Sequence, residues 1–366
     1  MQLRQIIHHL EALAPSVYQE SYDNSGLQVG LPDAEISGIL IALDFTEAVL
    51  EEAESRGCNL VVAHHPLLFK GLKRISDNTA IGRMVWKAIQ KGIHLYAIHT
   101  NLDHMAHGVN RILAQKLGLE NTRILIPQKD TLRKLQVYVP QKEAPQLLEA
   151  LFNAGAGQVG EYSECSYQIS GKGTFRPSEN ADPTIGKAGG AREEVTEIKV
   201  QVLVPKHRER PVLEAMFKAH PYEEVAYDLL DLANENPHQG IGMIGNLPEA
   251  ETVPDFLKRI KDALHTGCIR YTEPATQAIR KVAVCGGSGA GFLGAALRAG
   301  ADAYVTADFK YHEFFDAEGR ILIADVGHWE SEQYTTELLL TYLRKKLPNF
   351  AVHSAGSITN PVRYFH

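Results

Sequence analysis

Histidine and carboxylate side chains follow three apolar segments that have the pattern of buried strands. The three combinations of segment and polar residues are Asn59–Ala63 with His64 and His65, Ile93–Ile98 with Asp103, and Arg320–Asp325 with His328 and Glu332. Imidazole and carboxylate groups are common ligands of divalent transition metals. In open parallel sheets, ligands bind outside the carboxyl ends of the strands. We therefore expect these five side chains to meet as a metal site at the edge of one sheet.

The spacing of these residues favours two metal ions over one. His328 and Glu332 are four positions apart and would share one face of a helix. His64 and His65 are adjacent and would point to opposite faces of a regular strand, so one ion is a poor target for both. If Glu332 bridges, each ion has three protein ligands and open positions, as in catalytic sites. One hypothesis gives His65 and Asp103 to one metal, and His64 and His328 to the other.

Strands and helices alternate at both ends of the chain, which predicts βαβ units and a mostly parallel sheet. The remaining strands are predicted at Ile39–Leu43, Lys281–Cys285 and Asp302–Thr306. Helices are predicted after Thr46, near Thr79–Gln90, near Gly108–Leu117, and from about Gly327 to Lys346. The fold class is α/β.

The middle of the chain contains one strand–helix unit twice. Val137–Ala154 and Val202–Ala219 share eight residues in register at a constant offset, and strand-like sequence follows each copy. Two strand–helix–strand units predict a ferredoxin-like β-α-β-β-α-β domain. We predict this insert over residues 131–235, with an exposed hairpin loop at 176–192. The discontinuous α/β core then comprises residues 1–130 and 236–366.

The composition excludes several classes of protein. Hydrophobic residues make up 44% of the 366 residues and charged residues 22%, which is typical of a folded globular chain. The net charge of −7 argues against non-specific binding of nucleic acid, which needs a basic surface. No apolar run approaches the length of a membrane span, and the N-terminus lacks the pattern of a signal peptide. A cytoplasmic location is expected.

A glycine-rich segment offers two competing interpretations. Gly289–Gly294 matches G-x-G-x-x-G, the pattern of a dinucleotide site, but it does not begin where the preceding strand ends. Ser288 lies in a sequence close to a nucleophile elbow, but Ala290 replaces the last glycine of that motif. A tight strand-to-helix turn is the simpler interpretation, although its amide groups could hold an anion near the metals.

Four segments of the chain together resemble a known family. VVAHHPLLF, AIHTNLD, VTADFKYHE and DVGHWESE, with YDNSGLQVG near the start, resemble signatures of the GTP cyclohydrolase I type 2 (Nif-three-like) family. The resemblance implies a dinuclear metal site with ligands His64, His65, Asp103, His328 and Glu332. It also implies a toroidal homohexamer and an insert similar to PII or CutA modules.

The resemblance suggests a function as well as a site. The family name implies opening of the guanine ring of GTP, so we expect a metal-dependent hydrolase acting on a small-molecule or nucleotide-like substrate. Zn, Fe, Mn, Ni and Co fit the ligands equally well. Asp308 and His312 are candidates for catalysis or proton transfer, and Asp23 and Asn24 are similar candidates. The alternative is a non-catalytic metal-binding, chaperone or scaffold protein with a ligand-sensing insert.

Overall fold

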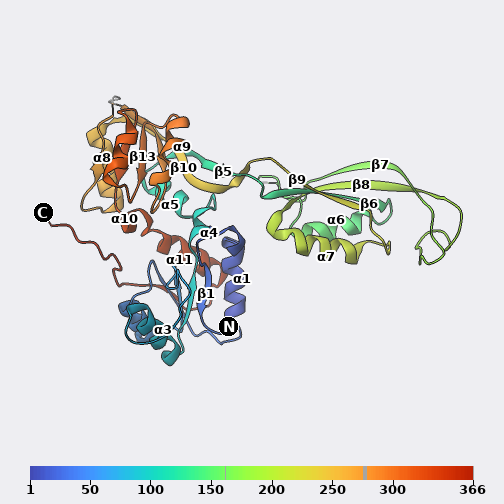
Figure 1. Ribbon diagram of the computed structural model, residues 1–366, viewed down its shortest axis with the longest axis horizontal. Helices are drawn as coiled ribbons and strands as arrows, with labels where there is room; N and C mark the ends of the chain where they lie inside the picture. The colour runs from blue at the N-terminus through green and yellow to red at the C-terminus, as the bar shows by residue number, and fades with distance from the viewer. Residues whose placement is uncertain (161, 275–277, 366) are drawn as a thin grey trace. The chain divides into compact units, whose positions relative to one another are not determined.

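The chain folds as two compact units, of which the first is discontinuous in sequence. The computed structural model describes residues 1–160, 162–274 and 278–365. Unit 1 combines Met1–Pro127 with His238–His366, and unit 2 is formed by Gln128–Pro237 (Figure 1). All candidate metal ligands belong to unit 1.

The first sheet of unit 1 is built mainly from the N-terminal segment. Its strands, in spatial order, are β1 (Gly26–Val29), β4 (His94–Ala97), β3 (Leu60–Ala63), β2 (Ile39–Ala42) and β15 (Val352–Ser354). All neighbours are parallel except β1, which is antiparallel to β4. Every residue of β2 and β3 is buried, so these strands are apolar throughout, as expected when both faces of a sheet are covered. Helices of this region are α1 (Leu3–Leu13), α2 (Glu47–Ser55), α3 (Ala80–Lys91), α4 (Thr100–Asp103) and the 3-10 helix η1 (Ser16–Tyr18).

The second sheet of unit 1 is built mainly from the C-terminal segment. Its strands, in order, are β11 (Arg270–Tyr271), β14 (Leu322–Asp325), β13 (Ala303–Thr306), β12 (Ala278–Val284), β10 (Asn236–Thr252) and β5 (Glu120–Gln128). The three central strands β12, β13 and β14 are parallel, whereas β10 pairs antiparallel with β12, and β11 pairs antiparallel with β14. The helices are α5 (Val109–Lys116), α8 (Val253–Leu264), α9 (Leu293–Arg298), α10 (His328–Glu332) and α11 (Thr335–Lys346), with η3 (Ala290–Phe292) and η4 (Tyr311–Ala317).

The α/β fold class is confirmed, but the prediction of a single sheet is wrong. β3 and β4 belong to the first sheet and β14 to the second, so the metal-type residues come from the strand ends of two sheets. Apolar runs identify buried strands but do not specify which sheet a strand joins. The predicted C-terminal helix is also two helices, because α10 ends at Glu332 and α11 begins at Thr335.

Unit 2 has the predicted element order β-α-β-β-α-β. The elements are β6 (Leu132–Pro140), α6 (Ala144–Asn153), β7 (Ser166–Phe175), β8 (Glu193–Pro205), η2 (Lys206–Arg208), α7 (Glu209–Ala219) and β9 (Tyr227–Asp231). The strands form an antiparallel sheet in the order β7-β8-β6-β9. Alternate residues of β6 and β8, such as Val137 and Val202, are buried in a separate core with α6 and α7. Residues 176–192 connect the β7–β8 hairpin.

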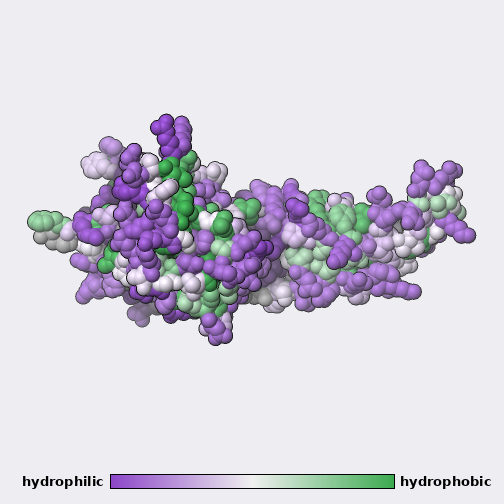
Figure 2. All heavy atoms as spheres, turned by 90° about the horizontal axis from the view of Figure 1, so that it is seen from below, coloured by the Kyte–Doolittle hydropathy of each residue, from purple (hydrophilic) through white to green (hydrophobic). Residues whose placement is uncertain are grey.

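Hydrophilic residues cover most of the face seen in Figure 2, and hydrophobic residues show as patches between them. Within the described ranges, no helix combines the length and apolar character needed to cross a membrane.

Candidate metal centre

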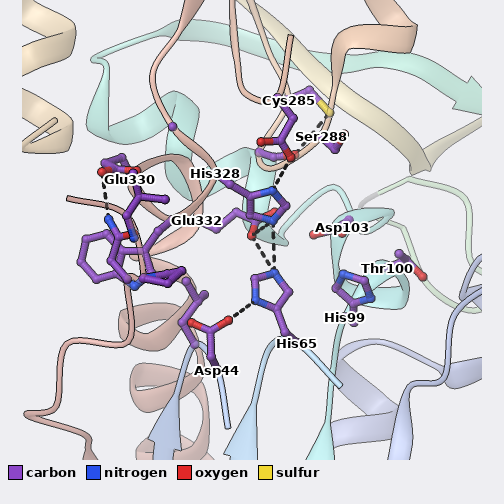
Figure 3. A pocket seen from close by; sticks show the side chains of 18 of the residues that line it. Asp44, His65, His99, Thr100, Asp103, Cys285, Ser288, His328, Glu330 and Glu332 are labelled. Atoms are coloured by element: carbon purple, nitrogen blue, oxygen red, sulfur yellow. Dashed lines mark hydrogen bonds and ion pairs between the residues drawn. The ribbon is translucent and has the colours of Figure 1, made fainter. Parts of the chain in front are cut away.

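The five candidate ligands come together inside unit 1, around the carboxylate of Glu332. Its Oε2 atom lies 3.0 Å from Nε2 of His65 and 3.2 Å from Nε2 of His328 (Figure 3). Its Oε1 atom lies 3.9 Å from Nε2 of His64. Only 3% of Glu332 is exposed, so the carboxylate is almost completely removed from water. One carboxylate therefore faces three imidazole rings.

His64 and Asp103 form the second half of the cluster. Nε2 of His64 lies 3.6 Å from Oδ1 of Asp103, which is beyond hydrogen-bonding distance. Both atoms are buried, and neither has a hydrogen-bond partner within the described chain. Buried polar groups are normally paired, so two unpaired ligand atoms that face each other fit a cation between them.

The candidate ligands fall into two groups, and the grouping differs from our hypothesis. The groups that share Glu332 are His65, His328 and Glu332, and His64, Asp103 and Glu332, each with its ligand atoms within 4.8 Å of one another. By the same distance, His64 and His65 also form a group with His99. We expected His65 with Asp103 and His64 with His328. The distances between ligand atoms instead favour His65 with His328 and His64 with Asp103, because a linear sequence does not specify which side of the cavity each strand end occupies. Glu332 belongs to both groups, as the hypothesis requires of a bridging ligand.

His64 and His65 point into the same site although they are adjacent in sequence. Their ring centroids are 4.9 Å apart. The alternation of side chains between faces applies within a regular strand, but β3 ends at Ala63 and the chain bends at the two histidines. The end of the strand thus permits an arrangement that its interior would forbid.

Each candidate histidine is fixed through its Nδ1 atom. Nδ1 of His64 bonds to the carbonyl oxygen of Ile98 at 2.8 Å, and Nδ1 of His65 bonds to Asp44 at 2.7 Å. Nδ1 of His328 bonds to Asp308 at 2.7 Å. Such partners fix the tautomer and orientation of metal-binding histidines. Nε2 of each ring is therefore directed at the carboxylates.

Interactions among the side chains of the cluster shift their pKa values strongly. Burial opposes protonation of His65, but its hydrogen bonds to Asp44 and Glu332 outweigh burial and raise the pKa to about 9. The pKa of His328 is raised to about 11 in the same way, by Asp308 and Glu332. Burial and the charge of Glu332 raise the pKa of Asp103 to about 7. A divalent cation would replace the protons that this dense set of charges otherwise attracts.

The glycine-rich segment leaves room for Glu332. Gly287 has φ +64°, and a Cβ atom there would lie 2.3 Å from Oε1 of Glu332. The N–H groups of Gly286, Gly287 and Gly289 donate to the side chains of Asn110, Ser331 and Thr306. These amides are thus already used inside the protein. The segment acts as a tight turn, and its geometry does not favour the dinucleotide or anion interpretation.

The structure separates the two residues that we predicted to be catalytic. Asp308 lies at the site, because it holds His328. His312 lies on η4, where it is exposed and packs against the rings of Tyr311 and Phe315. Contrary to its predicted position near the site, His312 does not line the cavity, because η4 begins at Tyr311, within the matching segment, and carries the ring to the surface.

Asp23 and Asn24 also differ in their relation to the site. Asp23 bonds to Nδ1 of His99 at 2.7 Å, so His99 lies between Asp23 and the cluster. Hydrogen bonds from His99 and Thr100 outweigh burial and lower the pKa of Asp23. The side chain of Asn24 instead donates to the carbonyl of Leu68, which is a loop contact.

Sequence reasoning missed two residues of this site. The ring of His99 lies 5.2 Å from that of His64 and 5.3 Å from that of His65, measured between centroids. Asp44 holds His65, as described above. Both follow a parallel strand closely, so the rule that found the ligands at strand ends could also have found them.

The cluster opens into a cavity of about 850 Å³. His65, Asp103, His328 and Glu332 line it, together with Cys285, Ser288 and Arg270. Aromatic side chains make up part of the wall: Tyr22, Phe45, Phe69, Phe292, Trp329 and Tyr364. The cavity is large enough for a ligand of the size of a nucleotide.

Fold and site together define a class of protein. It is an α/β chain with two mixed sheets whose central strands are parallel, and it has a buried histidine–carboxylate cluster able to hold metal. The comparisons then identify the family. The model of the Duf34/NIF3 (NGG1p interacting factor 3) family matches residues 1–361, and the chain belongs to this family.

Named relatives agree with this assignment. The chain is 43% identical over 326 residues to a "GTP cyclohydrolase 1 type 2 homolog" of Halalkalibacterium halodurans, covering 88% of this chain and 87% of the relative. It is 38% identical over 366 residues to the protein of the same name from Bacillus subtilis, covering 99% and 98%. A solved Bacillus cereus protein related to NIF3 superposes with a TM-score of 0.87 at 36% identity, covering 100% of this chain and 99% of the other.

Proposed function

We propose that this protein binds two divalent metal ions and uses them to hydrolyse a nucleotide-like substrate. The single observation that carries the proposal is the position of Glu332, which is buried and shared by two groups of candidate ligands. His65 and His328 would hold one ion with this carboxylate, and His64 and Asp103 would hold the other. The unpaired atoms of His64 and Asp103 support a cation between them.

The donor set suits catalysis better than a purely structural role. Each group supplies three protein ligands, whereas structural zinc sites are usually closed by four. When bound, two neighbouring divalent ions would supply Lewis-acid activation of water and stabilise negative charge during hydrolysis. Asp44 and Asp308 would keep His65 and His328 oriented for that task. Nitrogen and oxygen donors suit Zn, Fe, Mn, Ni and Co.

The substrate class rests on the shape of the cavity and on the family. The aromatic residues of the wall, such as Phe69 and Trp329, would accept a flat ring by stacking. Relatives bear the name GTP cyclohydrolase 1 type 2 homolog, which makes GTP the first compound to test. Fold-level analogy transfers a substrate less reliably than a ligand set, so the screen should extend to other nucleotides.

Metal analysis tests the centre itself. Tag-free protein purified without chelators should contain two equivalents of metal by mass spectrometry, and His328→Ala should contain about one. A wild-type chain that holds no metal after reconstitution would contradict the proposal.

Turnover separates the enzyme from the alternative of a metal carrier. Hydrolysis of GTP or another nucleotide should disappear in His328→Ala and in His64→Ala. A metal carrier would bind two ions, release them readily to a chelator, and show no hydrolysis with any nucleotide. Assembly into a homohexamer is a further part of the proposal, and light scattering of the purified protein should report six copies of the chain.

A further inference from the structure

The C-terminal segment, residues 355–364, connects the first sheet to the metal centre. The N–H of Ala355 donates to the carbonyl of Ile41 at 2.8 Å. The N–H groups of Gly356 and Ser357 then donate to the carboxylate of Glu52 at 2.8 and 3.0 Å. Beyond these anchors the segment forms part of the cavity wall, through Asn360, Pro361, Val362 and Tyr364.

Thr359 contacts a neighbour of each of two candidate ligands, His328 and His65. Its hydroxyl oxygen accepts a hydrogen bond from Nε1 of Trp329 at 3.1 Å, and its O–H donates to Oδ2 of Asp44. Trp329 is the residue after His328, and Asp44 is the residue that holds His65. One hydroxyl therefore links the segment that carries His328 to the carboxylate that holds His65.

The hydroxyl completes the set of contacts that fix Asp44. Oδ1 of Asp44 bonds to Nδ1 of His65, and Oδ2 accepts from Thr359, so both oxygens of the carboxylate are engaged (Figure 3 shows the contact with His65). A carboxylate held at both oxygens can rotate less than one held at a single oxygen. The orientation of His65 thus depends on a residue close to the C-terminus.

The two ligands that belong only to the second group, His64 and Asp103, have no such dependence. His64 is held by the backbone carbonyl of Ile98, and Asp103 lies at the end of α4. Neither contact involves the C-terminal segment. The two halves of the cluster therefore differ in what supports them.

We propose that Thr359 is a positioning residue for the metal held by His65 and His328. This inference rests on the proposed two-metal centre. Loss of the hydroxyl frees one oxygen of Asp44 and allows the ring of His65 to move. The ion held by His65 and His328 then binds more weakly, while the ion held by His64 and Asp103 keeps its affinity. Outer partners of this kind typically contribute about 10- to 100-fold to metal affinity.

A metal titration of three variants tests this role. Thr359→Val keeps the shape of the side chain but removes the hydroxyl, and Thr359→Ser keeps the hydroxyl. Ser357→Ala is the matched control, because it removes a hydroxyl of the same segment that bonds to Glu52 instead of Asp44. Metal-stripped protein is titrated with Zn²⁺ by calorimetry and with Co²⁺ by visible absorption, and the fold is checked by thermal unfolding.

The expected result is a loss confined to one ion. Thr359→Val should bind one equivalent as wild type does and the second about 10- to 100-fold more weakly. Thr359→Ser and Ser357→Ala should bind both equivalents as wild type does. Restoration by serine would show that the hydroxyl, and not the packing of the threonine, is responsible.

Three results would overturn the inference. If Thr359→Val binds both ions with wild-type affinity, the hydroxyl has no positioning role. If Ser357→Ala loses the ion equally, the effect belongs to docking of the whole segment. If wild type binds two ions and Thr359→Val loses both equally, the two halves do not differ. A wild-type chain that binds no metal would instead refute the two-metal centre on which the inference rests.

Discussion

Oε2 of Glu332 lies 3.0 Å from Nε2 of His65, although 267 positions separate the two residues in the chain. The contact joins the end of a strand in the first sheet to a short helix after a strand of the second sheet. Two consequences follow for the energetics. The carboxylate is held ionised, since its hydrogen bonds to histidines outweigh burial and lower its pKa. The site also exists only when both sheets of unit 1 are assembled.

Glu332→Gln should weaken the binding of both metal ions. The substitution preserves the size of the side chain but removes the negative charge that both groups of ligands share. The loss in affinity for each ion should be at least as large as the roughly 10- to 100-fold that an outer partner contributes. Metal content by mass spectrometry measures it, with Glu249→Gln on the exposed surface as the control. Full occupancy of both ions in Glu332→Gln would show that this carboxylate does not bridge.

Asp103→Asn should affect one ion only. Asp103 lies in the group with His64, whereas His65 and His328 form the other group with the shared carboxylate. We expect metal content to fall by about one equivalent. His312→Ala should keep both equivalents, because that ring lies outside the cavity lining. Equal loss in the two variants would contradict the grouping of the ligands.

The metal-free protein should become less stable as the pH rises above neutrality. The pKa values of His65 and His328 are raised to about 9 and about 11, so the folded state binds protons more tightly than the unfolded state, whose histidines titrate near 6.5. Their contribution is complete below about pH 6.5 and is lost as the pH rises through 9 towards 11. Unfolding temperatures of chelator-treated protein at pH 6.5, 8 and 9.5 would measure the decline.

A variant that lacks one of the two histidines provides a further test of this prediction. His65→Gln removes one of the two titrating rings, so the decline between pH 6.5 and 9.5 should be smaller than in wild type. An unfolding temperature that stays constant or increases over this interval in wild type would contradict the assigned protonation of the cluster.

Removal of unit 2 should leave the metal centre intact. All five candidate ligands lie in unit 1, and unit 2 has its own buried core around Val137 and Val202. The strands that lead into and out of unit 2, β5 and β10, are neighbours in one sheet, so a short Gly/Ser linker in place of Gln128–Pro237 can join them. We expect two equivalents of metal in this variant. A folded variant without metal would show that unit 2 contributes to the centre.

The sequence alone determined the types of the elements and most of the candidate site. Buried strands such as β2 and β3 are apolar runs, and Thr46 and Thr79 cap the helices that follow, so local patterns were sufficient to predict them. The internal repeat gave the order of elements in unit 2. The rule that ligands collect at the ends of parallel strands brought together residues as distant as His64 and His328.

Tertiary structure decided the relations that no local pattern encodes. Which strands share a sheet depends on long-range pairing. Because the strands form two sheets instead of one, His65 lies in a group with His328 and not with Asp103. The same folding carried His312 out of the cavity and brought Thr359 to Asp44. Periodicity and capping are properties of neighbouring residues, whereas these contacts depend on the packing of segments hundreds of residues apart.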